Sequence, residues 1–468
     1  MKKLIAAALV LAALAMAAVL ANQAVDRDRQ YHRLIVEGDE ALNRGQTFVA
    51  VEAYSGAIAL KPGSMLAYLK RGEAHQRRAD SPEILVAALR DLRTAAALDP
   101  GATRTLEKLG DVNFQLRRYA NAAESYEAYL RLDDQAPIIL YKLGLASRGD
   151  GRLVRAISSL QRSVALAPAF HEAHYLLGLC LKDRGQLDEA RLAFRRSVRQ
   201  SPAFIPAREE LAELHRLQER RRDEIEELDA LAALDPGKPE RQVAIGLAYL
   251  RAGNREQAIA KLREAAERFP QHGGVYVALG RVWLDAAEES MDQSDVRKAI
   301  EALAPVATQS TPTSQALGLY GRALVLAGRH DQAEQAFKQA SELLPLDLEV
   351  LPQYASTARR LGHLHEARRA LIRYSLLVDD EREKTIQAER IGDLSLAVND
   401  APAAVAWYRK SASRGADDAS LLARLADAQL RSGELEAARV TAQRAITADP
   451  NDGEAQAIAH RLQGLQAR

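Results

Sequence analysis

The sequence predicts an all-α fold, a solenoid of stacked helix-turn-helix repeats, and three observations carry this prediction. Small residues recur along the chain at intervals that are mostly 34 residues, a proline closes most of these intervals, and no stretch alternates apolar and polar residues as a β-strand does. The recurring small residues, called the ladder residues below, are Gly38, Gly72, Gly110, Gly144, Gly178, Ala212, Gly246, Gly280, Gly321, Ala355, Gly392 and Ala426. A fixed period of this length indicates one supersecondary unit stacked on copies of itself.

Each repeat is predicted to be a helical hairpin whose two helices cross closely. Twelve residues after most ladder residues, or a few more where a repeat is longer, the chain places an alanine. Small residues at both positions let the two backbones approach, with axes at the short end of roughly 8 to 10 Å. These alanines are Ala50, Ala88, Ala122, Ala156, Ala190, Ala258, Ala299, Ala333, Ala367, Ala404 and Ala438. Glu224 is the one departure at unbroken spacing.

Turn residues and prolines mark where the two helices of each repeat end. Seven residues after the ladder residue, most repeats have a residue that tolerates a left-handed backbone and so ends the first helix. These are Gly45, Gly151, Gly185, Gly253, Gly328, Gly362, Asn399 and Gly433. A proline 24 residues after the ladder residue ends the second helix, because it lacks the amide that a helix interior needs. These are Pro62, Pro168, Pro202, Pro236, Pro270, Pro345 and Pro450.

The repeats match a known pattern of a small residue, then alanine, an aromatic residue or leucine, and proline at set offsets. The first repeat matches it in Gly38, Ala50, Tyr54, Ala57 and Pro62, and the fifth in Leu177, Gly178, Ala190, Phe194 and Pro202. On these residues the chain resembles the tetratricopeptide repeat (TPR) family. The resemblance implies a right-handed superhelical solenoid of about twelve repeats within residues 25–452, whose first helices line a concave groove that binds protein segments.

Three interruptions and the C-terminus add detail to this domain organisation. Extra residues around 80–82 and 290–295 fall between the two helices of a repeat, where we expect them to form longer loops. The charged run 379–384 lies between repeats and suggests a flexure. Residues 453–468 are expected to form a capping helix, because the end of a solenoid needs a polar outer face.

Residues 1–24 are unlike the repeats and predict a membrane anchor or a signal peptide. Lys2 and Lys3 precede eighteen apolar residues, 4–21, so the lysines should stay in the cytoplasm while the rest of the chain crosses the membrane. The segment is short and alanine-rich, which favours cleavage, but no glycine or proline interrupts a helix that could continue into Tyr31. We expect an inner-membrane protein with a periplasmic solenoid, or a soluble periplasmic or secreted protein after signal cleavage.

No catalytic, cofactor-binding or metal-binding set emerges from the sequence. His171 and His174 lie three residues apart, too few and too close for a zinc site, and His363 and His365 merely flank a turn. Cys180, the single cysteine, is expected to be a small buried side chain. The formal net charge of +1 provides no field that attracts nucleic acid. We therefore expect neither an enzyme, nor a nucleic-acid partner, nor a small-molecule substrate.

A basic stripe, Arg191 to Arg199, follows the second helix of the fifth repeat and is reinforced by residues 220–222. Two interpretations stay open: a surface that binds phosphate groups, or an ordinary solvated face. The second is favoured because residues 223–235 carry six acids and no base immediately afterwards.

The groove positions, three residues before and one after each ladder residue, give the candidate partner-binding site. In the middle of the chain they are Tyr141, Leu145, Tyr175, Leu179, Val243, Leu247, Val277 and Arg281. Toward the ends they become acidic, at Glu107, Asp111, Glu389, Asp393 and Asp427. Exposed apolar residues in a concave surface generally mark binding, although neighbouring repeats or a loop could also cover them.

These features predict a non-catalytic protein-interaction scaffold of the bacterial cell envelope with a role in assembly or secretion. Its partners would be proteins or peptides held in the groove, with the membrane contacted through residues 4–21. The alternative is an accessory subunit that presents substrate to a catalytic partner or clamps that enzyme. The envelope role rests on analogy with similar architectures.

Overall fold

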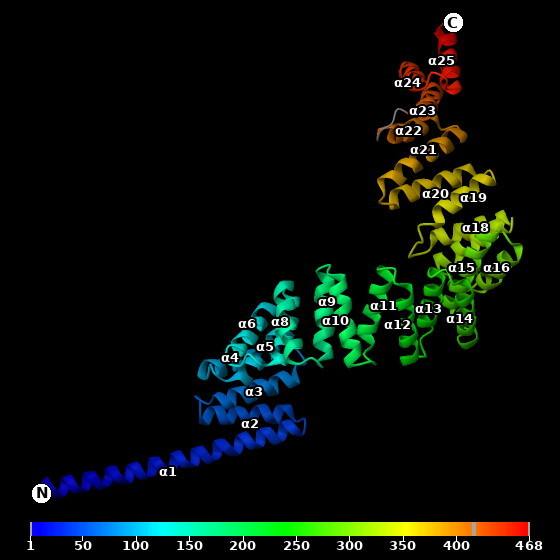
Figure 1. Cartoon of the computed structure of the whole chain (residues 1–468). Helices are drawn as coiled ribbons and strands as arrows, with labels where there is room; N and C mark the ends of the chain where they lie inside the picture. Colours follow the sequence, from blue (N-terminus) through cyan, green and yellow to red (C-terminus); the bar gives the residue numbers. More distant parts are fainter. Residues whose placement is uncertain (1, 414–417, 467–468) are drawn as a thin grey trace. The chain divides into compact units, whose positions relative to one another are not determined.

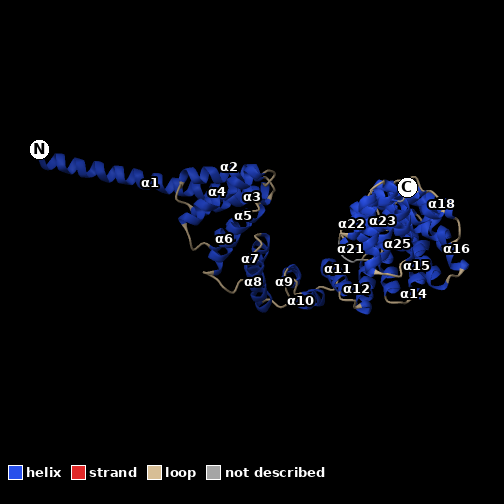
Figure 2. Cartoon of the chain, turned by 90° about the horizontal axis from the view of Figure 1, so that it is seen from above, coloured by secondary structure: helices blue, strands red, loops and turns tan. Residues whose placement is uncertain are grey.

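The computed structural model describes residues 2–413 and 418–466, with side chains left undescribed at 2–13, 15, 18 and 465–466. Over those residues the chain forms 25 helices and no strand, which confirms the all-α prediction (Figure 2). The chain divides into two compact units, residues 1–227 and 228–468, and the division falls within α12.

The first unit consists of consecutive antiparallel hairpins, each an odd-numbered helix followed by an even-numbered one (Figure 1). Its helices are α1 (Lys2–Asn43), α2 (Thr47–Leu60), α3 (Met65–Arg78), α4 (Pro82–Leu98), α5 (Thr103–Gln115), α6 (Tyr119–Leu130), α7 (Pro137–Gly149), α8 (Leu153–Leu166), α9 (His171–Asp183), α10 (Leu187–Gln200), α11 (Ile205–Leu217) and the start of α12 (Arg221–Leu234). Each hairpin also packs against the next one along the chain.

The second unit repeats this arrangement and adds one unpaired helix at its end. Its helices are α13 (Pro239–Arg251), α14 (Arg255–Arg268), α15 (Gly273–Ser290), α16 (Gln293–Ala307), α17 (Ser314–Leu326), α18 (His330–Glu342), α19 (Val350–Arg360), α20 (Leu364–Leu377), α21 (Glu381–Ala397), α22 (Ala401–Ala412), α23 (Ala419–Ser432), α24 (Leu435–Ala448) and α25 (Gly453–Gln466). α25 packs Ala455, Ile458 and Leu462 against α23 and α24 and exposes His460 and Arg461.

The ladder residues all lie on odd-numbered helices, and the ladder glycines face a large side chain of the second helix. A Cβ added at Gly178 would lie 2.5 Å from Cε1 of Phe194, and one added at Gly246 would lie 2.5 Å from Cγ of Leu262. The predicted contact of small residue with small residue is therefore incomplete. The alanine of the second helix is buried, but the ladder glycine mainly makes room for the ring or leucine four residues beyond it.

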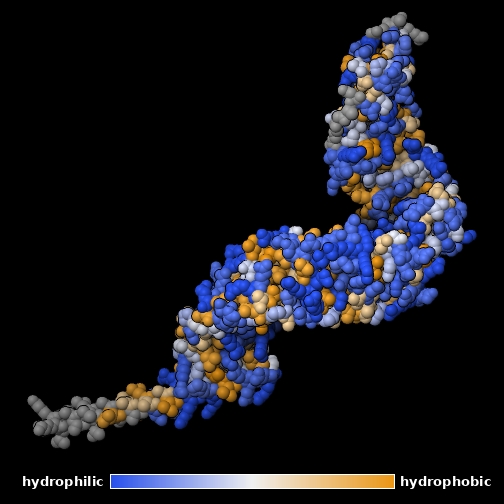
Figure 3. Space-filling view, viewed as in Figure 1, coloured by the Kyte–Doolittle hydropathy of each residue, from blue (hydrophilic) through white to orange (hydrophobic). Residues whose placement is uncertain are grey.

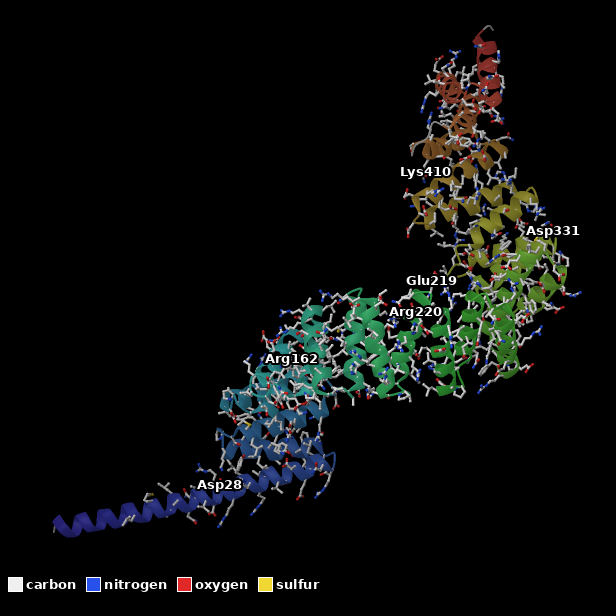
Figure 4. The ribbon with its side chains drawn as sticks, viewed as in Figure 1. Asp28, Arg162, Glu219, Arg220, Asp331 and Lys410 are labelled. Atoms are coloured by element: carbon white, nitrogen blue, oxygen red, sulfur yellow. The ribbon has the colours of Figure 1, made fainter. Side chains whose placement is uncertain are left out.

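The turns within the hairpins have the left-handed backbone that their glycines predict, for example Gly185 with φ of 80° and Gly253 with φ of 75°. Arg117 and Glu219 occupy the same turn position and also have positive φ, at 57° and 56°, which the sequence did not indicate. Figure 4 marks Glu219 and Arg220 at the turn between α11 and α12. The position within the repeat thus determines this backbone conformation, even where the residue type disfavours a positive φ.

The helix ends predicted from the prolines are found in the structure, but the loops predicted from the two insertions are not. Second helices end two or three residues before each of the predicted prolines, as expected. The extra residues at 80–82 and 290–295, however, do not form long loops. They lengthen α4 to 17 residues and α15 to 18, so that only short connections remain. A continued helix keeps its backbone hydrogen bonds, which a long loop would have to satisfy elsewhere.

The charged run 379–384 provides the start of α21. The side chain of Asp380 accepts hydrogen bonds from the backbone amides of Arg382 and Glu383, which caps the helix. This run lies inside the second unit, away from the division between the two units. The predicted flexure there stays a prediction.

The N-terminal helix α1 continues unbroken from Lys2 to Asn43, and its first part extends away from the rest of the first unit (Figure 1). Its C-terminal part packs Tyr31, Ile35 and Leu42 against α2 and α3. The predicted membrane segment, 4–21, lies mostly outside the described side chains. Within the part that is described, no helix is long and apolar enough to cross a membrane.

Candidate partner-binding cavity

In the second unit, four of the predicted groove residues line one cavity of about 320 Å³. Val243 and Leu247 come from α13, and Val277 and Arg281 come from α15. The remaining lining comes from the start of α15, the end of α16, the connection 308–313 and the start of α17. These residues are Gly273, Gly274, Ala278, Val306, Gln309, Thr311, Thr313 and Gln315.

Helical spacing explains why these side chains converge. Val243 and Leu247 are four residues apart and so lie on one face of α13, while Val277 and Arg281 have the same relation on α15. α13 and α15 pack against each other as neighbouring first helices. The two faces therefore form an apolar floor, on which Val243, Leu247 and Val277 are each half-buried.

Polar groups form the rim of this cavity. Arg281 is exposed, and Gln309, Thr311 and Gln315 are exposed on the side opposite α13. Thr313 Oγ1 accepts a hydrogen bond of 3.1 Å from the amide of Ala316, which caps α17 and fixes this side of the rim. Amide, hydroxyl and guanidinium groups around an apolar floor can hydrogen-bond a peptide backbone while its side chain is buried.

The charge at the rim is positive but partly balanced. One turn beyond Arg281 lies Asp285, whose pKa is raised mainly by burial, with Arg281 opposing the shift. Among the lining residues that the structure describes there is no carboxylate, imidazole or thiol. The polar groups of the lining are hydroxyls, amides and one guanidinium, which suit the binding of a peptide backbone.

In the first unit, the four predicted groove residues are partly covered. Tyr141, Leu145, Tyr175 and Leu179 pack against the apolar core around α8, α9 and α10. The Phe170 ring lies 5.0 Å from that of Tyr141, and the Phe204 ring lies 5.3 Å from that of Tyr175 in an edge-to-face arrangement. Burial, together with a glutamate nearby, raises the pKa of Tyr141 and likewise that of Tyr175. Phenylalanine rings from the neighbouring connections therefore contact Tyr141 and Tyr175, as expected if neighbouring repeats or a loop cover the groove residues.

The acidic groove positions toward the ends of the chain are ion-paired with basic side chains. Lys142 of α7 reaches back to α5 and donates to Glu107 and Asp111, at 2.6 and 2.8 Å. Arg424 of α23 donates in the same way to Glu389 and Asp393 of α21, at 2.5 and 3.3 Å.

Asp427 is also paired, with Arg431 and with Arg461 of α25. Lys142, Arg424, Arg431 and Arg461 come later in the chain than the acids they pair with, so the groove positions alone did not reveal them; Asp111 also pairs with the preceding Lys108. These carboxylates hold neighbouring helices together and leave little charge for a partner.

Three hairpins share a further hydrogen-bonded set at this position. Tyr54 donates to Asp39, Tyr126 to Asp111 and Tyr408 to Asp393, at 2.6, 2.9 and 2.6 Å, and a cation from the next repeat pairs with each aspartate. Burial and the aspartate partner raise the pKa of each tyrosine. Despite burial, hydrogen bonds from Lys70 and Tyr54 lower the pKa of Asp39.

The isolated histidines and the cysteine have ordinary surroundings. His174 Nε2 lies 3.0 Å from the carbonyl oxygen of Pro168, and the ring of His171 packs edge-on against Phe204. Cys180 is fully buried, and burial raises its pKa to about 11. Over the described residues, no three or more histidine, cysteine, aspartate or glutamate side chains are grouped as a metal site.

Sequence reasoning missed the residues that decide which groove positions are open. Phe170 and Phe204 lie eight residues before Gly178 and Ala212, and Thr313 lies eight before Gly321. Thr311 and Gln309 precede it in the longest interval between ladder residues, 41 residues from Gly280 to Gly321. The extra residues of that interval lie around 290–295 and lengthen α15, so its length did not point to the connection 308–313.

Comparison with family models identifies tetratricopeptide repeats in much of the chain. One such model matches residues 87–137, 141–203, 243–288 and 284–347, and a second matches residues 419–452. Together the matches cover just over half of the chain. Both units contain matched repeats, and the matched parts of the second unit include every residue that lines its cavity.

Individual proteins match over shorter stretches. The chain is 29% identical over 115 residues to small glutamine-rich tetratricopeptide repeat-containing protein 2 of Mycosarcoma maydis, covering 25% of this chain and 31% of that protein. It is 30% identical over 111 residues to the type IV pilus assembly protein PilF of Pseudomonas aeruginosa, covering 23% of this chain and 41% of PilF. The crystal structure of YrrB, a TPR protein with an unusual peptide-binding site, aligns with a TM-score of 0.36 and 25% identity, covering 44% of this chain and 99% of YrrB. The chain therefore spans only about a third of the length of the two curated relatives, from Mycosarcoma maydis and Pseudomonas aeruginosa.

Proposed function

This chain carries tetratricopeptide repeats, and we propose that it is a non-catalytic scaffold that holds a protein segment in the cavity of its second unit. The observation that carries the proposal is the convergence of Val243, Leu247, Val277 and Arg281 on one cavity. These residues occupy the register positions that bind partners in the family the sequence resembles. An open apolar floor with a polar rim is what a segment with an apolar side chain and a free backbone requires.

The size of the cavity limits what enters it. A volume of about 320 Å³ is at the low end for ligand pockets, of roughly 300 to 1,000 Å³. It accommodates one or two apolar side chains of a longer segment, whose remaining residues lie over the rim. The partner is therefore a protein or peptide that inserts an apolar residue beside Arg281, with no chemical step.

We place this scaffold in the bacterial cell envelope. The support is in the N-terminus, where Lys2 and Lys3 precede the apolar residues 4–21, and in the partial similarity to a pilus assembly protein. An inner-membrane anchor with both units in the periplasm fits the continuous helix α1, and signal cleavage is the competing outcome. Sequencing the N-terminus of the mature protein decides between them, because a start near Asn22 excludes the anchor.

Site-specific photo-crosslinking tests the cavity. A photoreactive residue in place of Val277 should capture a defined partner in living cells, and Leu247→Asp in the same chain should remove that product, because a carboxylate on the floor repels an apolar side chain. The matched control places the photoreactive residue at Leu179, a half-buried groove position of the first unit. Far-UV circular dichroism shows whether both variants keep their helicity.

The outcomes of this experiment separate the possible roles. An unchanged crosslinked product in the Leu247→Asp variant contradicts the proposed site. If the only product at Val277 is one enzyme in fixed stoichiometry, the chain is an accessory subunit of that enzyme. Several structural envelope proteins among the products support the scaffold.

A further inference from the structure

A second surface of the first unit has the features of a binding groove, and it lies on the even-numbered helices. One cavity of about 910 Å³ opens between α8 and α10, and another of about 1070 Å³ opens between α6 and α8. Both are lined by Val154, Ser158 and Arg184, so they adjoin along α8 and form one surface. We call it the α6–α8–α10 groove. The predicted binding positions on the odd-numbered helices are not part of it.

Apolar side chains are exposed in this groove. Val154 is 66% exposed and Leu192 is 47% exposed, although both are large apolar residues on regular helices. Between them the floor is formed by Ile157, Leu177 and Leu181, which also belong to the buried core. Figure 3 shows apolar surface gathered over the α5–α8 part of this unit. Such a contiguous apolar area rimmed by polar groups generally marks an interaction site.

Arginines surround this apolar floor, and several have no acidic partner. Arg155 pairs with Glu127, Arg152 pairs with Asp150 at 2.8 Å, and Arg162, labelled in Figure 4, donates to a backbone carbonyl. Four further arginines of the lining form no ion pair with any carboxylate of the described chain: Arg131, Arg184, Arg196 and Arg199. The acids of the lining are Glu127, already paired, and Glu189. The groove therefore has a positive excess.

This arrangement refines the basic stripe that the sequence indicated. Arg191 is largely buried and pairs with Asp188 at 3.3 Å, and Arg195 does not line the groove. Only Arg196 and Arg199 face it, together with arginines from other helices that the stripe did not include. The positive surface thus crosses three helices, which no single-helix pattern could reveal.

We propose that the α6–α8–α10 groove binds an acidic protein segment that carries apolar side chains, independently of the cavity in the second unit. Unpaired arginines complement carboxylates, while the exposed Val154 and Leu192 need an apolar counterpart. A nucleic acid would satisfy the arginines but not the apolar floor. The described lining also contains no phenylalanine, tyrosine or tryptophan on which bases could stack. A flat lipid surface cannot enter a groove between helices, whereas a peptide can.

Fluorescence anisotropy with the full chain tests this proposal. The probe is a labelled peptide of about 15 residues in which leucines recur every third or fourth position among glutamates, as on an amphipathic helix. We expect it to bind, and we expect the Arg196→Glu, Arg199→Glu variant to bind it at least about tenfold more weakly, with a milder loss for the glutamine pair. Val154→Ser with Leu192→Ser should also weaken binding several-fold, since it removes the apolar contact.

Matched controls keep the test specific. Arg90 and Arg93 are exposed on α4, another even-numbered helix of the same unit, and line neither cavity. Their reversal to glutamate should leave affinity for the probe within about twofold. Equal binding of a probe with lysine in place of glutamate would overturn the proposal. So would tighter binding of a single-stranded oligonucleotide or of anionic vesicles, or an affinity that the serine variants leave unchanged.

Discussion

The apolar groove positions are half-buried in both units, but in the first unit two of them contact a phenylalanine ring, whereas in the second unit they border a cavity. The residue at the start of the following first helix accounts for this difference. Phe170 covers Tyr141 and Phe204 covers Tyr175, whereas Thr313 at the equivalent position caps α17 and leaves Val277 at the edge of a cavity. His272, another equivalent residue, contacts Glu240 at 3.2 Å instead of covering the floor. An apolar groove residue is therefore available for binding only when the connection after its hairpin supplies no ring.

The largest expected effect concerns what the two units share, the close packing at their ladder glycines. Gly178→Val and Gly246→Val should each lower the free energy of unfolding by about 3 kcal/mol, because the new Cβ meets Phe194 or Leu262 at 2.5 Å. Urea denaturation measures this loss. The matched control is Gly464→Val on α25, where no atom lies near the added Cβ and we expect almost no change. Similar losses at both ladder positions would show that the units differ in their connections and not in their framework.

Exchanging the connecting residues tests the comparison directly. Phe204→Thr should lower the free energy of unfolding by about 2 kcal/mol, since the ring contacts of Tyr175 and His171 are lost with its buried apolar area. It should also expose Tyr175 to a quencher of tyrosine fluorescence. If the variant is as stable as the wild type and its tyrosine stays protected, Phe204 is not the cover.

The reverse exchange, Thr313→Phe, should fill the cavity of the second unit and remove the crosslinked product obtained at Val277. Thr313→Ser serves as the control because it keeps an oxygen that caps α17. Loss of the product in the serine variant as well, which keeps the cap and adds no bulk, would show that filling the cavity is not what removes the product.

The sequence predicts the framework far better than it predicts which groove residues are open. Positions set by the period, such as Gly178, Gly185 and Pro202, lie where the hairpin model puts them, because one residue decides each of these local features. The cavity needs α13, α15, the end of α16 and the connection 308–313 together. Val243 and Val277 could be placed on its floor from register, but Gln309 and Thr311 belong to an irregular connection that has no period.

Charge pairing shows a second reason why site prediction stopped short. Asp111 was found by its groove position, but its partners Tyr126 and Lys142 lie 15 and 31 residues later in the chain. Only stacking of consecutive hairpins brings them together. A rule that looks one repeat ahead for a basic residue, two before the next ladder residue, would have found Lys142 and Arg424.

A smaller effect on stability is expected in the hairpins in which a tyrosine, an aspartate and a cation form a hydrogen-bonded set. Tyr126→Phe and Tyr408→Phe should each cost about 1 kcal/mol, because the aspartate loses a hydrogen bond while keeping its cation. Urea midpoints measure the change. The reciprocal change is Phe194→Tyr, in a hairpin where Leu179 occupies the groove position that is aspartate in the other three. It should also lower the free energy of unfolding, because no carboxylate is there to accept a hydrogen bond from the new hydroxyl. If Phe194→Tyr is neutral, the hydroxyl needs no aspartate, and the set has no stabilising role.

The smallest effect is a dependence on pH that we expect in the first unit. Three histidines, one half-buried and two buried, lie there, and burial lowers the pKa of each below its ordinary value of about 6.5. The nearest charged group facing each is Asp91 for His75, Arg196 for His174 and Asp223 for His215. Below pH 6.5 the unfolded chain binds protons that the folded unit does not. Stability is therefore complete above about pH 6.5 and falls as the pH drops toward the lowered values.

Hydrogen exchange resolves this dependence unit by unit. After correction for intrinsic rates, amides of α3, α9 and α11 should lose protection between pH 7.5 and pH 5.5, because His75, His174 and His215 lie on these helices. His174→Gln, which keeps a polar group near the Pro168 carbonyl, should reduce the loss in α9 specifically. If α9 responds to pH equally in the wild type and in this variant, the burial of His174 does not govern the stability of the unit. A loss confined to α3, α9 and α11 would show that the stability of the first unit depends on keeping these histidines neutral.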